Sequence, residues 1–341
     1  YNTKLKMLNA AEYGQVMWQA YINGGINPNS NAAGYVYDYT LNGDGSATLQ
    51  NMYLPAFLDP EQTMRTSDTD WFDEVYRPAW TQSYEFSAQG GTENTVFFAS
   101  GQYKNEEGIV SGTDLERMSV RLNLSHKASD KCTFGFKFNP SYTTQHSTEE
   151  PGYTSSPVTT AYTAKPTISV MNDGEYNFVN KFYNPVGILN LNENYNKTKR
   201  LLGNASLEYK FPLNFEFKTI ANIDYINVDE YAYLHPKTPN GIDKNGVASY
   251  YSTNVTTWTS SSTLKWEYRR LRHSLQLMAG AEIEENSLNY SNMIASNFAS
   301  EDLSSIANAS QMEQMNEFGK EASLLSGISS LNYNYGAKYF L

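Results

Sequence analysis

The chain has 341 residues, with 36 acidic and 25 basic side chains and a formal net charge of −11. This acidic balance argues against a nucleic-acid-binding protein, because phosphate groups need a basic surface. The single cysteine, Cys132, excludes an intrachain disulfide and a cysteine-based zinc site, and the lack of any run of about 18 consecutive apolar residues excludes a transmembrane helix.

The first element expected in chain order is a helix in the stretch "MLNAAEYGQVMWQAYINGG" (7–25). Asn9 is placed to cap its start, and Gly24 and Gly25 are placed to end it. Its loose apolar stripe consists of Leu8, Ala11, Val16 and Ala20. Residues 26–70 carry Pro, Gly, Asn and Asp throughout, which predicts a long irregular segment.

After Trp71 the pattern changes to alternation with a period of two residues. In "MSVRLNLSHKASDKCTFGFKFNPSYTT" (118–144), apolar residues such as Leu122 and Phe136 alternate with polar ones such as Arg121 and Lys137. The same alternation recurs over 84–103, 205–225 and 264–284, and a last strand is expected near "LLSGISSLNYNYGAKYFL". The sequence therefore predicts antiparallel strands, each with one apolar face and one polar face.

The connections between these strands fall into two sets of unequal length. One set is tight, at 90–94, 129–130, 212 and 269–272. The other set is mostly long, at 145–195, 230–248 and 290–322, with a shorter connection at 104–115. Short turns at one end and long loops at the other are typical of an outer-membrane barrel.

Alternation alone does not separate a lipid-facing strand from a strand of a soluble β-sandwich. Met118 to Ala128 covers eleven positions, which at about 3.3 Å per residue and a tilt near 45° rise roughly 26 Å. This rise matches the apolar band of about 25 Å on outer-membrane barrels. The polar face mixes Lys, Arg and Glu with Ser, Thr and Asn, as a hydrated lumen requires. These features favour a transmembrane barrel over a soluble all-β fold.

A series of short motifs adds a family resemblance. The segment from Thr69 to Phe136 carries in order "TDWFDE", a "GG" turn, "FFASGQY", "EGIV" and "RMSVRLNL". "LNAAEY" (8–13) precedes this segment and "SGISSLNYNYGAKYFL" (326–341) follows it. Each motif is short, but the set in this order resembles the barrel of SusC/RagA-type TonB-dependent transporters of Bacteroidetes.

The resemblance implies an all-β fold that is one segment of a large antiparallel transmembrane β-barrel. Family barrels have 22 strands, and about nine or ten strands are expected here, with a short N-terminal helix and long extracellular loops. Residues 1–341 would all belong to one barrel domain, with a helix and long loop in 1–70 and strands and loops in 71–341. The plug domain and the C-terminal strands are expected to be absent. The start lacks Met and a signal peptide, so an excised or mature segment is expected.

The resemblance also implies a function. Members of the family import a large nutrient across the outer membrane of Gram-negative bacteria, driven by TonB, and a SusD-like surface lipoprotein caps the long loops. The expected substrate is a glycan, in preference to a peptide. No enzymatic activity, catalytic residue or cofactor is expected. TonB would act through the N-terminal region of the parent protein, which is missing here.

Two sets of residues are candidates for contact with substrate or plug. Aromatic rings in the expected extracellular segments can stack on sugars or peptide side chains, although packing between loops explains any single ring equally well; they are Tyr35, Tyr37, Tyr39, Tyr153, Tyr162, Tyr176, Phe178, Tyr183, Tyr250 and Tyr251. On the polar face, Arg117, Arg121 and Lys137 are expected to point into the lumen. They would line a path or contact the plug, and the plug contact is favoured.

Motifs for covalent or metal chemistry are missing from the sequence. The four histidines are scattered without ligand spacing, and no HExxH, GxSxG or P-loop pattern occurs. Glu149 and Glu150 are neighbours in a Pro- and Gly-containing segment, where solvated carboxylates are the simpler interpretation. Two alternatives stay open: a soluble secreted all-β protein that binds glycans through exposed tyrosines, and, less favoured, a β-rich glycan-cleaving enzyme.

Overall fold

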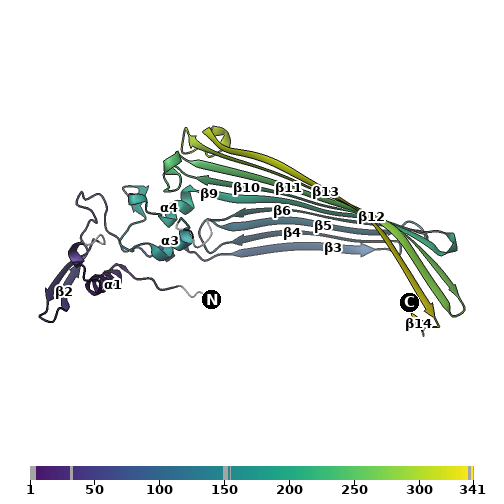
Figure 1. The fold of residues 1–341 in the computed structure, drawn as a ribbon, viewed down its shortest axis with the longest axis horizontal. Helices are drawn as coiled ribbons and strands as arrows, with labels where there is room; N and C mark the ends of the chain where they lie inside the picture. The colour runs from purple at the N-terminus through teal and green to yellow at the C-terminus, as the bar shows by residue number, and fades with distance from the viewer. Residues whose placement is uncertain (1–4, 31–33, 149–152, 154, 337–338, 341) are drawn as a thin grey trace.

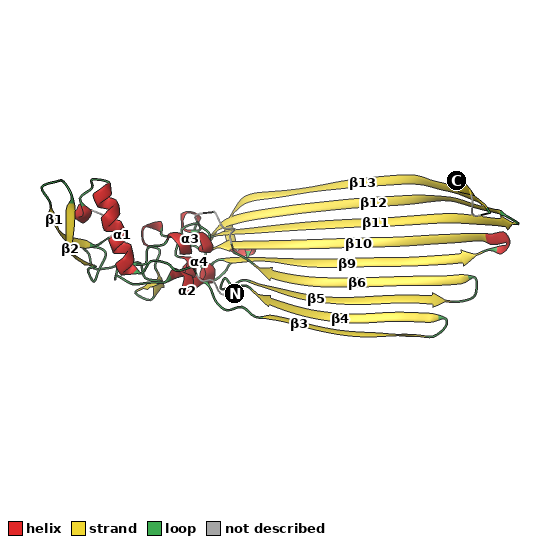
Figure 2. Cartoon of the chain, turned by 90° about the horizontal axis from the view of Figure 1, so that it is seen from below, coloured by secondary structure: helices red, strands yellow, loops and turns green. Residues whose placement is uncertain are grey.

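The computed structural model describes residues 5–30, 34–148, 153, 155–336 and 339–340. Its main body is one ten-stranded antiparallel sheet with the strand order β14-β13-β12-β11-β10-β9-β6-β5-β4-β3 (Figures 1 and 2). Every strand pairs with the previous strand of this sheet in the sequence, so the sheet is a simple meander. This arrangement confirms the predicted antiparallel all-β fold.

The strands of the main sheet lengthen along the chain from β3 to β13. They are β3 (Thr81–Gly91), β4 (Thr95–Glu107), β5 (Asp114–Lys127), β6 (Cys132–His146), β9 (Glu193–Lys210), β10 (Phe215–Leu234), β11 (Val247–Arg270), β12 (His273–Phe298), β13 (Ala309–Tyr335) and β14 (Tyr339–Phe340). The smaller elements are α1 (Ala10–Asn23), β1 (Val36–Leu41), β2 (Ala47–Tyr53), α2 (Trp71–Val75), α3 (Pro157–Thr163), β7 (Met171–Asn172), β8 (Glu175–Tyr176) and α4 (Pro185–Leu191), with short 3-10 turns at 28–30, 179–181, 212–214, 242–244 and 306–308. None of the helices in the described residues is long and apolar enough to cross a membrane.

The two ends of the sheet differ as the sequence predicts. The predicted tight turns lie at one end, and the helices and longer connections lie at the other, which we call the loop end (Figure 1). The long connection between β6 and β9 is confirmed and contains α3, β7, β8 and α4. The long loops predicted at 230–248 and 290–322 are wrong: the connections are only 235–246 and 299–308, because the strands continue on both sides.

The N-terminal helix α1 forms with the predicted caps. The Asn9 side chain accepts a hydrogen bond from the Glu12 N–H at 2.8 Å, and the Glu12 carboxylate accepts one from the Asn9 N–H at 3.1 Å. The predicted apolar stripe is wrong, since Leu8 and Val16 are exposed. The face that is buried consists of Ala10, Gly14 and Trp18.

The irregular segment predicted for 26–70 contains a β-hairpin, which corrects the sequence analysis. Strands β1 and β2 pair antiparallel around a turn at 42–46, where Gly45 has φ 83°. The hairpin packs against the buried face of α1, which explains why that face differs from the predicted stripe. We call α1, β1 and β2 the N-terminal module; it lies beyond the loop end of the sheet (Figure 2).

The main sheet is a single layer, whereas buried apolar clusters lie near the loop end. One cluster is the core of the N-terminal module, a second joins α2 to α3, and a third surrounds Tyr233 and Phe298 where β10 and β12 end. Within the described residues, no second layer covers the apolar side chains in the rest of the sheet. A soluble sandwich buries its apolar sheet face against such a layer.

Candidate functional site

One face of the sheet, which we call the outer face, carries large apolar side chains open to the surroundings. Leu122 is 40% exposed and Phe136 is 45% exposed, although both lie in the interior of hydrogen-bonded strands. The same face carries Leu124, Phe134, Ile223, Leu264, Leu277 and Leu331 from neighbouring strands. An apolar surface of this extent requires a partner, and hydrocarbon chains are the partner that fits a single-layered sheet.

Aromatic residues border this apolar band on both sides. Toward the tight turns the border contains Tyr209, Phe215, Trp266, Tyr268 and Tyr333, and toward the loop end it contains Tyr84, Tyr103, Tyr142 and Tyr225. Along β10, the band extends from Phe215 to Tyr225, and ten residue steps at about 3.3 Å and a tilt near 45° rise roughly 23 Å. Aromatic borders at this separation match the two interfaces of an outer membrane.

Beyond Tyr225 the outer face becomes polar while the strands continue. The Asp229 carboxylate accepts hydrogen bonds from the Tyr250 hydroxyl at 2.9 Å and the Ser252 hydroxyl at 2.7 Å, and Lys199 Nζ lies 3.6 Å away. Asn227 donates to Asn254 Oδ1 at 3.0 Å. Strands β9 to β13 therefore extend past the apolar band into water, and the alternation that identifies lipid-facing strands ends where the band ends.

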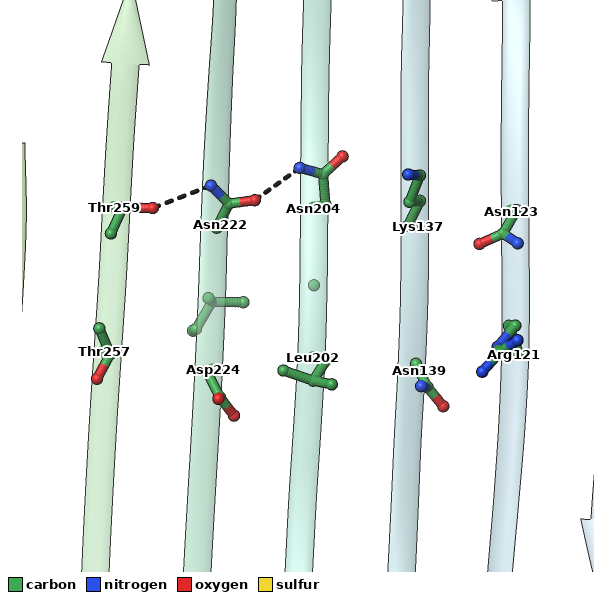
Figure 3. Close-up of a pocket in the computed structure, with 12 residues that line it drawn as sticks. Arg121, Asn123, Lys137, Asn139, Leu202, Asn204, Asn222, Asp224, Thr257 and Thr259 are labelled. Carbon is green, nitrogen blue, oxygen red and sulfur yellow. Dashed lines mark hydrogen bonds between the residues drawn. The ribbon is translucent and has the colours of Figure 1, made fainter. Parts of the chain in front are cut away.

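The opposite face, which we call the groove face, is polar at the level of the apolar band. Figure 3 shows side chains from five neighbouring strands, β5, β6, β9, β10 and β11, around an open groove of about 530 Å³. The polar residues that line it are Arg121, Asn123, Lys137, Asn139, Asn204, Asn222, Asp224, Thr257 and Thr259. Strand alternation places them opposite Leu122, Phe136 and Ile223, so the groove face has the chemistry of a wet barrel interior.

Hydrogen bonds across the strands hold the central part of the groove. Asn204 Nδ2 donates to Asn222 Oδ1 at 2.6 Å, and Asn222 Nδ2 donates to Thr259 Oγ1 at 2.9 Å (Figure 3). Arg200 makes a two-pronged ion pair with Asp224 at the edge of the groove. The sequence indicates that these residues are on the polar face, but their mutual contacts depend on the register between strands, which the alternation pattern does not contain.

The three cations predicted to face the lumen, Arg117, Arg121 and Lys137, all lie on the groove face. Arg121 is two residues from Asn123, which pairs directly with Lys137 on the neighbouring strand. Arg121 and Lys137 line the groove itself, and Arg117 lies nearer the loop end on β5. The structure therefore brings two of the three together at one groove.

The candidate residues Tyr37 and Tyr39 lie in strand β1, and Tyr35 directly precedes this strand; the three rings pack in the core of the N-terminal module. Tyr35 and Tyr37 are 4% and 2% exposed, and their hydroxyls donate to the backbone carbonyls of Ala10 and Gly14 in α1. Burial raises the pKa of Tyr37 to about 12 and raises the pKa of Tyr35 further. The Tyr39 ring lies 5.2 Å from Trp18. In this arrangement these rings pack the module, which leaves Tyr35 and Tyr37 little surface for a ligand.

The other predicted aromatic residues are distributed over several elements at the loop end. Tyr153 is 65% exposed, and Tyr162 on α3 is 47% exposed with an edge-to-face contact to Phe72 at 4.8 Å. Tyr176, Phe178 and Tyr183 are half-buried in the β6–β9 connection. Tyr250 and Tyr251 lie in β11 and not in a loop, and strand alternation places Tyr250 on the outer face and Tyr251 on the groove face. The structure does not gather these rings into one site.

Candidate chemistry based on acidic or metal-binding clusters gains no support from the described structure. Glu149 and Glu150 lie outside the described residues. In the parts of the chain that the structure describes, no group of three or more His, Cys, Asp and Glu side chains is placed to hold a metal ion.

Comparisons with known proteins agree with the barrel geometry. No protein-family profile matches the chain. It is 26% identical over 249 residues to TonB-dependent receptor P26 of Formosa agariphila, a match that covers 70% of this chain and 24% of that receptor. It is 22% identical over 219 residues to TonB-dependent receptor SusC of Bacteroides thetaiotaomicron, covering 56% of this chain and 22% of SusC. The chain thus spans about a quarter of the length of these relatives.

A solved structure has the same fold. The RagAB peptide transporter superposes with a TM-score of 0.66 at 16% sequence identity, over 83% of this chain and 32% of the transporter chain. The curated relatives, the superposition and the exposed apolar band all confirm the resemblance drawn from the sequence motifs. The chain is therefore similar, in sequence and in fold, to part of the transmembrane β-barrel of SusC/RagA-type TonB-dependent transporters, which are proteins of the Gram-negative outer membrane.

Proposed function

We propose that the complete protein imports a large nutrient across the outer membrane, with energy supplied through TonB. The observation that carries this proposal is the sheet with two chemically opposite faces, an exposed apolar band on one side and a polar groove at the same level on the other. Such a wall separates lipid from an aqueous passage. In this proposal the protein binds and moves its substrate without breaking covalent bonds, so it is a transporter and not an enzyme.

The proposal extends to parts and partners outside this chain. Residues 1–341 form part of one barrel domain, and a plug domain fills the passage that the groove face lines. Arg117, Arg121 and Lys137 face that passage, where the plug or the substrate contacts them. A SusD-like lipoprotein covers the loop end, where the connections carry exposed rings such as Tyr153 and Tyr162. Such rings can stack on sugars or on peptide side chains, and a glycan is the proposed substrate in preference to a peptide.

Deletion of the parent gene tests this proposal. The deletion strain should lose growth on one class of glycans or peptides, and a strain that lacks TonB function should show the same loss. Fractionation of wild-type cells should place the protein in the outer membrane together with a surface lipoprotein. Growth on every glycan and peptide in the absence of the gene would contradict the import role, and recovery of the protein from the culture medium would favour the soluble glycan-binding alternative.

A further inference from the structure

Two positive charges in the groove lack the carboxylate partners that several other cations on the same face possess. Lys104 pairs with Glu106 at 2.7 Å, Arg200 with Asp224 at 2.8 Å, and Lys265 with Glu267 at 2.8 Å. Arg121 and Lys137 form no ion pair with any carboxylate in the described part of the chain. Both side chains are exposed in the groove. Their surroundings therefore leave room for an anionic ligand.

The rest of the groove is rich in hydrogen-bonding groups. Four asparagine amides and two threonine hydroxyls face the same space as the two cations. Asp224 also lines the groove, where its carboxylate is paired with Arg200. The remaining lining comes from Leu202, Gly203 and Ile223, and strand alternation directs Ile223 toward the outer face. Thr257 and Thr259 accept hydrogen bonds from neighbouring asparagines, while Asn123 and Asn139 make no side-chain hydrogen bond within the described residues.

This composition distinguishes between possible occupants. A plug segment can also occupy this groove, and the cell assays described below separate it from a ligand. A neutral sugar would use the amides and hydroxyls but would leave both cations without a counter-charge. A carboxylated glycan satisfies both kinds of group, because its hydroxyls bond to the amides of Asn123 and Asn139 and its carboxylates form charge-assisted hydrogen bonds with Arg121 and Lys137. These four residues lie on β5 and β6, on the side of the groove away from Asp224. The volume of about 530 Å³ lies within the range of small-molecule sites.

We propose that the groove is a subsite on the import path for the carboxylate groups of an acidic oligosaccharide. Arg121 and Lys137 bind the carboxylates, and Asn123 and Asn139 bond to the hydroxyls beside them. This inference rests on the proposed import function and deepens it by naming the substrate class. It replaces the prediction that the two cations contact the plug.

Matched ligands test the charge requirement directly. The complete transporter, purified in detergent, is titrated calorimetrically with oligosaccharides prepared from a panel of uronic-acid polysaccharides and with their carboxyl-reduced, neutral counterparts. At least one acidic member should bind about 10-fold or more tightly than its neutral counterpart, since each charge-assisted hydrogen bond is worth about that factor. The preference should weaken as NaCl is raised. Equal binding of every acidic and neutral pair, or no binding of any acidic member, would overturn the proposal.

Variants locate the preference in the groove. Arg121→Gln with Lys137→Gln should abolish the preference for the acidic form and leave the affinity for the neutral form within about twofold. The matched control is Lys265→Gln, which removes a groove-face cation that already has a carboxylate partner, and it should retain the preference. Unchanged binding in the double variant would place the acidic site elsewhere and overturn the assignment.

Cell assays separate this inference from the plug contact and from the proposed function. If the two cations hold the plug, the double variant should admit large antibiotics in the absence of substrate while its ligand preference stays unchanged, which would also overturn the proposal. If acidic oligosaccharide uptake requires TonB but does not depend on the two cations, the import function stands and the subsite fails. If uptake is independent of TonB, the proposed function itself fails.

Discussion

Arg200 on β9 and Asp224 on β10 form a two-pronged ion pair across neighbouring strands. Arg200 Nε donates to Asp224 Oδ1 at 3.1 Å, and Nη2 donates to Oδ2 at 2.8 Å. Leu202 lies directly opposite Asp224 in the register, so the arginine reaches its partner diagonally. Because Asp224 lines the groove, its carboxylate neutralises Arg200 and adds a negative charge to the groove that also contains Arg121 and Lys137, two or more strands away.

Replacing Asp224 by Asn should therefore strengthen binding of an acidic ligand. The change removes a like charge from the groove and releases the Arg200 guanidinium from its partner. Asp224 lies two strands from Lys137 and three from Arg121. A carboxylate bound at Lys137 is roughly 10 Å away, where a unit charge in water contributes about 0.4 kcal/mol. Affinity for an acidic oligosaccharide should therefore rise about twofold while affinity for its carboxyl-reduced form stays constant. Titration calorimetry on the complete transporter measures both. The control is Asp243→Asn, whose carboxylate pairs with Lys181 outside the groove; a similar rise there, or weaker binding in the Asp224 variant, would contradict the expectation.

Adjacent positions on β5 test the assignment of the two faces. Leu122→Arg should destabilise the folded protein in a bilayer by about 2–4 kcal/mol, because it places a cation against hydrocarbon. Asn123→Arg, one residue along the strand and on the groove face, should change stability by less than about 0.5 kcal/mol. Urea titration of the complete protein folded into lipid vesicles provides the comparison. Nitroxide labels at Leu122 and Phe136 should also report lipid, and equal costs for the two variants would refute the lipid assignment.

These two faces are the part of the structure that the sequence predicts best. Side chains in a strand alternate strictly between the faces, so the lipid-facing Leu122 and the groove-facing Arg121 follow from neighbouring letters. The tight turns also follow, because Gly, Ser, Asp and Pro interrupt the alternation. The caps of α1 follow from Asn9 and Glu12, whose spacing is local.

Other parts depend on contacts that single-sequence patterns do not contain. Above the membrane both faces of a strand meet water or loops, so the polar positions around Asp229 resemble a loop and hide the continuation of the strands. The apolar stripe predicted for α1 lies on the wrong side of the helix. The hairpin approaches the helix at Gly14, and because glycine has no apolar side chain, the sequence pattern does not identify this face as buried. The meeting of Arg121, Lys137 and Asn204 requires the register of three strands.

Replacement of Gly14 by alanine should destabilise the packing of the N-terminal module. A Cβ atom at this position would lie 2.5 Å from Tyr35 Cε1 and 2.6 Å from Met52 Sδ. Gly14→Ala gains about 1 kcal/mol of helix propensity, but forcing a methyl group into the contact costs about 1–3 kcal/mol. The net effect should be a destabilisation of about 1 kcal/mol. Hydrogen exchange in peptides that cover 10–53 measures it.

The control for this variant lies in the turn of the same hairpin. At Gly43 a Cβ atom meets nothing within 4 Å, so Gly43→Ala should leave the exchange rates of α1 unchanged. Slower exchange in the Gly14 variant would mean that the module adjusts to the methyl group, and the close approach of Tyr35 would then have no energetic role.

His235 should make the β10–β11 connection sensitive to acid. Its side chain is buried, and Nδ1 accepts the Lys237 N–H at 3.1 Å. Burial lowers the pKa of His235 below its ordinary value. The positive charge of Lys237 lowers this pKa further, whereas the negative charges of Glu301 and Asp302 raise it in part. The folded state therefore binds fewer protons than the unfolded state. The stability that neutral His235 contributes is present above its unfolded pKa of about 6.5 and is lost as the pH falls through the folded value.

Hydrogen exchange of residues 235–246, measured between pH 7.5 and pH 5 with correction for intrinsic rates, detects this loss. His235→Asn retains an acceptor near the position of Nδ1 and removes the titration, so its protection should be nearly independent of pH in this range. If wild-type and variant lose protection in parallel, a group other than His235 is responsible for the acid sensitivity.

The ladder between β10 and β11 has a mechanical consequence. Twenty consecutive residue pairs join the two strands from Phe215 to Leu234 without a register shift, so one continuous stretch of backbone hydrogen bonds runs from the tight turns, through the apolar band, to the loop end. Bending or shearing this wall at any height would break several of these bonds together. This part of the wall should therefore be a stiff frame, and larger movements should be confined to the connecting segments at the loop end.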